Sequence, residues 1–219
     1  MTQSNSLTAD ESRSENIAKM GTDFGEVYSA LWQQLAWLHR KWGHYVELFG
    51  TSPDRIALLN DTAPNSFRTV QDSLREDVFL NIARLTDSPK TAGKEKFSFK
   101  RLPIMFADTE LRNEVEEKLA VLEMATDFSR DWRNRKLAHG DLALALSRVT
   151  APLAPASRAH VNEALHAMGQ VLNTISLHFL GSSTIFEFSG KSGASGAGSL
   201  LHYLLAGKEA ERQRRDRLR

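Results

Sequence analysis

The sequence predicts an all-α protein, a bundle of four principal helices accompanied by short ones. Over four long stretches, apolar residues recur at steps of three and four, which places them on one face of a helix. No stretch shows the clear alternation of apolar and polar residues that marks a strand. Because 41% of the 219 residues are hydrophobic, the chain can bury the core that such a bundle requires.

The N-terminal segment, residues 1–20, is expected to be a disordered tail. As far as Asn16 it is polar and offers too little apolar surface to offset the entropy of ordering it. The helical domain is expected over residues 21–188. Its first long helix runs from about Thr22 to a stop at Gly50. The residues predicted to face inward are Phe24, Val27, Leu31, Leu35, Leu38, Trp42, Tyr45 and Phe49.

Two further helices are predicted before the middle of the chain. Ser52 caps a short helix that ends at Leu59, with proline at its first position. Asp61 or Thr62 caps the second long helix, which ends near Asp87. The residues predicted to face inward from this helix are Phe67, Val70, Leu74, Val78, Ile82 and Leu85.

The polar connection SPKTAGKEK leads to a short helix that Ser98 caps and that Pro103 keeps short. Asp108 opens the third long helix, whose apolar pattern continues through Trp132 to a stop at Gly140. The short helix contains Phe99, Leu102 and Ile104. The residues predicted to face inward from the long one are Leu111, Val115, Leu119, Leu122 and Met124 or Ala125.

The last third of the chain contains the fourth long helix and a separate C-terminal helix. Ser157 is expected to cap the fourth helix, Arg158–Leu180. Residues 189–198 form a linker rich in glycine and serine, and a basic helix follows over residues 199–219. A short segment of mixed charge such as this helix is usually a solvated face.

Several classes of chemistry are excluded by the residues that the chain lacks. It has no cysteine, which rules out disulfides, thiolate metal sites and cysteine nucleophiles. No apolar run approaches the roughly 18 residues of a membrane span and no signal peptide opens the chain, so a cytoplasmic protein without a membrane partner is expected. Glu163 and His166 form a single Glu-x-x-His pair, whereas di-iron bundles need two. We therefore expect no metal and no cofactor.

The stretch DWRNRKLAHGD, residues 131–141, combines the groups needed for metal-free RNA cleavage. Arg133 offers a planar cation for phosphate, Asn134 a neutral amide that donates and accepts, and His139 a side chain that moves protons near neutral pH. In that reaction the ribose 2′-hydroxyl attacks its own phosphodiester, a base removes the hydroxyl proton, an acid protonates the leaving oxygen and a cation stabilises the phosphorane. Arg135 and Lys136 add positive charge for binding the substrate.

The spacing within this motif indicates a homodimer. On a straight helix, six residues turn through about 600°, which leaves Arg133 and His139 roughly 120° apart. One copy therefore holds its groups loosely, whereas two copies facing each other across a two-fold axis could supply acid, base and phosphate-binding groups to one cleft. A helix that ends at Gly140 favours protonated His139, but Arg135 and Lys136 oppose this, so the protonation state stays open.

The motif resembles the Arg-x4-6-His signature of HEPN (higher eukaryotes and prokaryotes nucleotide-binding) domains. The wider phrase RNRKLAHGD, together with NIARLTDSP earlier in the chain, is similar to the abortive-infection U-type (AbiU-like) branch of that superfamily, over roughly Gly21 to Leu180. The resemblance implies a dimerising all-α bundle. It also implies a metal-independent endoribonuclease that acts as a toxin or in phage defence on transfer, ribosomal or messenger RNA, with a possible cognate antitoxin. By the same resemblance, Arg133 would bind the scissile phosphate, Asn134 would orient the phosphate or the 2′-hydroxyl, and His139 would be the general acid or base.

Two other interpretations stay open at the level of sequence. The same residues could hold a nucleotide or an RNA end without cutting it, in a binding or protein-interaction module, because the superfamily includes non-catalytic members. Alternatively, His139 could cap a helix whose last turn the arginines solvate, and the dimer would then serve assembly alone.

Overall fold

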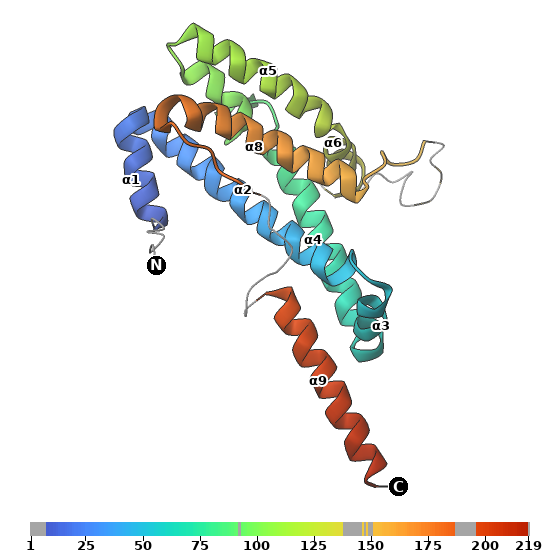
Figure 1. Ribbon diagram of the computed structural model, residues 1–219. Coiled ribbons are helices and arrows are strands. Elements are labelled where there is room, and N and C mark those ends of the chain that lie inside the picture. Colours follow the sequence, from blue (N-terminus) through green and yellow to red (C-terminus); the bar gives the residue numbers. More distant parts are fainter. Residues whose placement is uncertain are drawn as a thin grey trace. The chain divides into compact units, whose positions relative to one another are not determined.

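The computed structural model describes residues 8–91, 93–137, 146, 148, 151–186 and 196–218 (Figure 1). The predicted all-α fold is confirmed. The elements are α1 (Ala9–Met20), α2 (Thr22–Phe49), α3 (Pro53–Thr62), α4 (Pro64–Leu85), β1 (Lys90–Thr91), β2 (Lys94–Glu95), the 3₁₀ helix η1 (Phe99–Met105), α5 (Thr109–Ala125), α6 (Asp127–Trp132), the π-helical turn η2 (Arg133–Leu137), α8 (Arg158–Leu180) and α9 (Ala197–Asp216).

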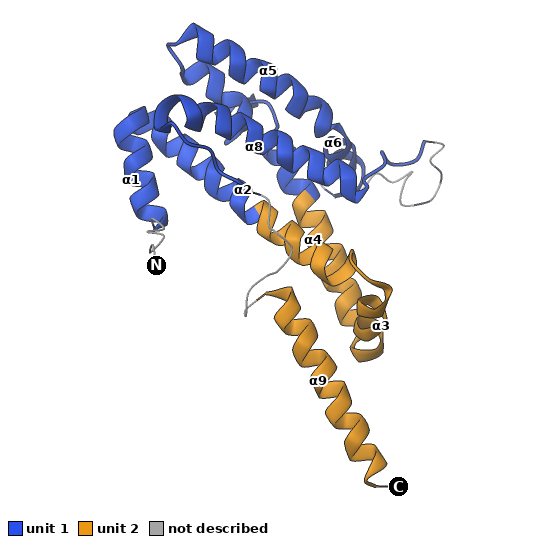
Figure 2. Cartoon of the chain, viewed as in Figure 1, with its two compact units in different colours: residues 1–37, 79–186 blue, residues 38–78, 187–219 orange. Residues whose placement is uncertain are grey.

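The chain divides into two compact units (Figure 2). Unit 1 comprises residues 1–37 and 79–186, and unit 2 comprises residues 38–78 and 187–219. Helices α2 and α4 each contribute residues to both units. None of the described helices is long and apolar enough to cross a membrane.

Four of the predicted helix caps are confirmed, and each works by the same chemistry. Side-chain oxygens of Ser52, Ser98, Asp108 and Ser157 accept hydrogen bonds from backbone N–H groups of the first turn, at 2.8 to 3.3 Å. Those N–H groups have no partner within the helix, so a short polar side chain at the cap offsets their burial. The predicted cap at Asp61 or Thr62 is wrong, because both residues lie in the last turn of α3 and Pro64 opens α4.

The core of unit 1 is built around α8, which packs against α5. The apolar steps of three and four in α8 predict six inward residues, of which Val161, Leu165, Met168, Leu172 and Ile175 are buried and Phe179 is half-buried. The predicted inward positions of Val70 and Met124 are wrong, since these side chains are 40% and 74% exposed, whereas Ala125, the alternative to Met124, is half-buried. Met124 lies one residue before the end of α5, where the 3.6-residue period no longer decides which face a side chain takes.

Unit 2 has a small core of its own. Leu48 and Leu59 pack with Ala197 and Leu201, so that α9 closes an apolar cluster on α3. Phe49, Leu58, Phe67 and Leu204 surround this cluster. The C-terminal helix therefore begins two residues earlier than expected and takes part in the fold through its first turns.

The N-terminus differs from the expected disordered tail, because residues Ala9–Met20 form helix α1. Thr8 accepts a hydrogen bond from the Glu11 N–H at 3.2 Å, and the Glu11 carboxylate accepts one from the Thr8 N–H at 2.7 Å. The Thr8 N–H and the Thr8 hydroxyl, which both donate to this carboxylate, hold the pKa of Glu11 below its usual value. Asn16 donates to Ser29 at 2.9 Å in a buried contact with α2. Since α1 begins at a capping box and contacts α2 through a polar pair, its sequence lacks the apolar stripe that periodicity detects.

Candidate RNA-binding site at the end of α6

The first half of the sequence motif forms the π-helical turn η2, which directly follows α6. The third long helix is therefore not continuous to Gly140 as predicted. Thr126 interrupts it: its hydroxyl donates to the Leu122 carbonyl at 2.8 Å and the helix restarts at Asp127. Single π-helical turns often occur at functional sites because they widen the helix locally. His139 and Gly140 lie outside the described residues.

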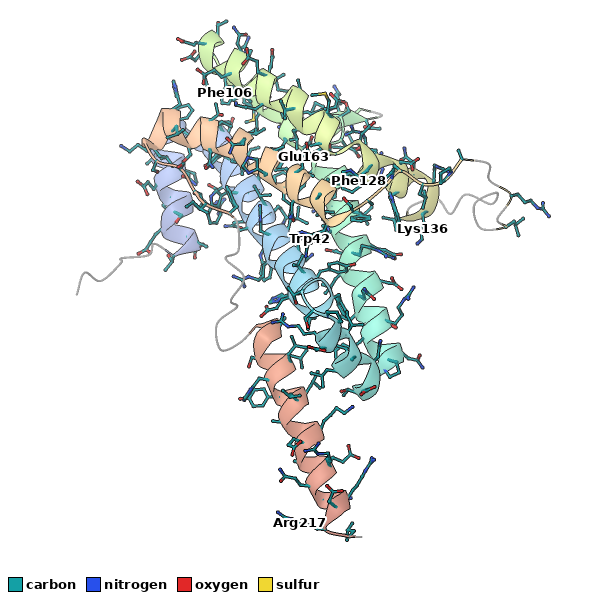
Figure 3. All side chains as sticks on the ribbon, turned by 45° about the vertical axis from the view of Figure 1, so that its right-hand side comes forward. Trp42, Phe106, Phe128, Lys136, Glu163 and Arg217 are labelled. Atoms are coloured by element: carbon teal, nitrogen blue, oxygen red, sulfur yellow. The ribbon has the colours of Figure 1, made fainter. Side chains whose placement is uncertain are left out.

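Helix α6 is fixed to α4 by aromatic packing. Phe79 meets Phe128 edge to face at 5.4 Å between ring centroids, and meets Trp132 in the same way at 5.2 Å. Figure 3 labels Phe128 on this segment and Lys136 nearer its end. The rigid aromatic contact sets where the motif begins, since Arg133 follows Trp132 directly.

Arg133 is held by two partners. Its Nη1 donates to Oδ1 of Asp87, which lies just beyond the end of α4, and its Nε donates to Oδ1 of Asn134 at 3.0 Å. These bonds orient the guanidinium and also the Asn134 amide, whose oxygen is the acceptor. The two sequence stretches that carry the family resemblance, ARLTD and RNRKLAHGD, therefore meet in a direct ion pair.

Asp87 also binds a second cation, Lys96. Lys96 Nζ lies 3.3 Å from the other oxygen of Asp87, Oδ2. Burial pushes the pKa of the Asp87 carboxyl up, but the hydrogen bonds and charges of Arg133 and Lys96 outweigh it and leave the pKa below its ordinary value. Asp87 is thus a stable anion between two cations.

The Arg135 side chain, which the sequence predicts to bind substrate, makes contacts within the protein. Its guanidinium donates to the carbonyls of Ala151 and Pro152 at 2.7 and 3.0 Å and lies 3.3 Å from Asp131. Asp131 also accepts from the Ala154 N–H at 2.8 Å. These contacts tie residues 151–154 back to the helix that carries the motif.

Lys136 is exposed at the surface of the turn, and its ammonium lies 5.1 Å from the centroid of the Trp132 ring. A cation at this distance is attracted by the ring face. Lys136 therefore carries its positive charge at the surface, three residues after Arg133 in the same turn. Within the described part of the chain, no group of three or more His, Asp or Glu side chains is placed to hold a metal ion.

Comparison with known proteins identifies the family. The sequence model of the HEPN family AbiU2 matches residues 21–193. The chain belongs to the AbiU2 family of HEPN domains. The match includes Asp87, Lys96 and the whole motif, so the resemblance predicted from two short anchors is confirmed over most of the chain. No curated protein and no solved structure matches the chain.

Sequence reasoning did not assign Asp87 or Lys96 to the site. Asp87 stands in the ARLTD stretch, which the resemblance singled out as an anchor without giving its acid a role. Lys96 stands in a connection that appeared only polar. Asp87 is an acid at the end of a predicted helix, and the arginine of the motif needs an anionic partner. These two observations together could have pointed to Asp87.

Proposed function

We propose that this AbiU2-family HEPN domain is a metal-independent endoribonuclease. In this proposal the ribose 2′-oxygen forms a bond to phosphorus and the bond from phosphorus to the 5′-oxygen breaks. The hydroxyl proton passes to a base, and the leaving oxygen takes a proton from an acid. The products are a 2′,3′-cyclic phosphate and a 5′-hydroxyl.

The observation that carries the proposal is the oriented pair Arg133 and Asn134. The Arg133 side chain is 22% exposed, so a phosphate can reach it from solvent while Asp87 and Asn134 fix its plane. A guanidinium held in advance stabilises the charge of a phosphorane without reorganising during the reaction. We assign Arg133 to the scissile phosphate, Asn134 to the phosphate or the 2′-hydroxyl, and His139 to general acid or base catalysis.

The wider role that we propose follows from family membership. An AbiU-like HEPN nuclease would act as a toxin or in abortive infection against phage, with transfer, ribosomal or messenger RNA as target and an antitoxin to restrain it. A homodimer would place two motifs on one substrate, so that one His139 could act as base and the other as acid. Lys136 would bind a substrate phosphate, and Arg135 would support the turn.

A non-catalytic RNA-binding or nucleotide-binding module is the second candidate, and the ion pair of Arg133 favours it. Asp87 already neutralises part of the guanidinium charge, which weakens its attraction for a developing phosphorane. Binding does not require that extra stabilisation, because ground-state phosphate carries less charge.

The test is incubation of purified protein with total cellular RNA in excess EDTA, followed by end-group analysis of the fragments. Wild type and the control Lys94→Ala, an exposed residue outside the site, should give discrete fragments with 2′,3′-cyclic phosphate ends. Arg133→Ala and His139→Ala should give none. Fragments that persist unchanged in His139→Ala would contradict the assigned mechanism, and RNA that is bound but never cut would select the second candidate.

A further inference from the structure

We propose that Lys96 is a second phosphate-binding residue of this site, held beside Arg133 by Asp87, and that it contacts the RNA phosphate next to the scissile one. This inference rests on the proposed function in taking RNA as the ligand. It adds a residue outside the motif, from the segment that follows strand β2.

The geometry places the two cations side by side. Arg133 and Lys96 bind different oxygens of one carboxylate, Oδ1 and Oδ2 of Asp87. The carboxylate therefore keeps two positive groups close together that would otherwise repel each other. Two adjacent cations suit a single RNA strand, which presents its phosphates in succession along the backbone.

The two cations, Arg133 and Lys96, are more exposed to solvent than the carboxylate that binds them. The Asp87 side chain is 17% exposed, Arg133 is 22% exposed and Lys96 is 40% exposed, so the negative group is the most buried of the three. Two cations and one anion leave this trio with a formal charge of +1. Because a partly exposed ion pair contributes little to stability, Lys96 can turn from Asp87 to a phosphate at small cost.

The backbone around Lys96 is fixed to the segment that carries Asp87. The Lys96 N–H donates to the Pro89 carbonyl at 2.8 Å, and β1 pairs with β2 in antiparallel register. The Ser98 hydroxyl donates to the Asp87 carbonyl at 2.5 Å. These contacts hold the lysine Cα in place, so that only the side chain moves when it meets a ligand.

The test measures binding without cleavage, in a His139→Ala background, using fluorescence anisotropy of a labelled single-stranded RNA over a range of salt concentrations. Each phosphate contact on a single strand contributes about 0.7 to the slope of log affinity against log salt, which corresponds to about fivefold in Kd near 0.1 M salt. Adding Lys96→Ala should raise Kd by that factor and make the slope shallower by about 0.7. Lys96→Arg should restore both quantities, and Lys94→Ala, two residues earlier and exposed, should change neither.

The outcomes separate this inference from the nuclease proposal. Equal Kd and equal slope for the Lys96→Ala and Lys94→Ala proteins overturn it, as does a His139→Ala protein that binds no RNA. A wild type that cuts no RNA, combined with binding that depends on Lys96, rejects the nuclease and supports the inference. If Lys96→Ala lowers the melting temperature, Lys96→Gln, which keeps most of the side chain, replaces it in the same comparison.

Discussion

Asp87 and Arg133 stand 46 residues apart in the chain, yet their side chains form one ion pair where the HEPN motif begins. Asp87 lies just past the end of α4 and Arg133 just past the end of α6, and these helices are joined by Phe79, Phe128 and Trp132. Because the aromatic contacts fix both helix ends, the ion pair forms between groups already held close. The site therefore depends on packing as much as on the motif itself.

Asp87→Asn should lower RNA cleavage with little change in the fold. The amide keeps the size of the carboxyl but loses the charge that holds Arg133 and Lys96, and a catalytic group displaced by about 1 Å can cost about 100-fold in rate. Single-turnover cleavage should show the loss in the chemical step. Asp87→Glu should recover part of the rate. The control is Asp77→Asn, which removes the acid of a more exposed ion pair with Lys41 in unit 2 and should leave the cleavage rate unchanged.

Acid should weaken the fold through Asp87. Its pKa in the folded chain lies below the ordinary 3.8, since Arg133 and Lys96 outweigh the opposing effect of burial. The unfolded carboxyl therefore takes up a proton first as pH falls, so the contribution to stability is complete above about pH 5 and is lost as pH passes through the folded pKa. The melting temperatures of wild type and Asp87→Asn should converge as the pH falls below about 5 and passes through the folded pKa of Asp87. A constant difference over that range would contradict this role.

Arg135→Ala should destabilise unit 1 by about 0.5 to 1.5 kcal/mol, because it removes the hydrogen bonds to the carbonyls of Ala151 and Pro152 and the ion pair with Asp131. Arg135→Lys should recover only part of this loss, since one ammonium cannot match the fork of a guanidinium. Thermal unfolding measures both variants. The salt dependence of RNA binding should stay that of wild type, and a shallower slope would instead return Arg135 to the substrate contacts.

Gly25→Ala should detach α1 from α2. A Cβ at position 25 would lie 2.7 Å from Ile17 Cα, which is backbone and cannot turn aside. Overpacking of this kind costs about 1 to 3 kcal/mol. Amide hydrogen exchange should show lower protection over Ala9–Met20. The matched control is Gly207→Ala in α9, where a Cβ meets nothing within 4 Å and alanine should favour the helix.

The elements of this fold could largely be predicted from sequence, because they depend on local chemistry. Helix α8 begins and ends where its cap and apolar period indicate, and α2 covers its predicted range. Helix α1 was missed because Asn16, Ser29 and Gly25 make its contacts with α2, and none of them is apolar.

The candidate site was predicted only in part. Arg133 and Asn134 are recognisable because both belong to one short motif. The partners Asp87 and Lys96 come from segments that approach the motif only in the folded chain, and no periodicity encodes that meeting. The break at Thr126 also escaped prediction, since a single threonine inside an apolar pattern does not by itself end a helix.

The small core of unit 2 has a consequence for synthesis on the ribosome. Leu48 and Leu59 emerge first, whereas Ala197 and Leu201, which cover them, are translated much later. Domains fold as their residues emerge, so the nascent protein carries an open apolar patch until α9 leaves the exit tunnel.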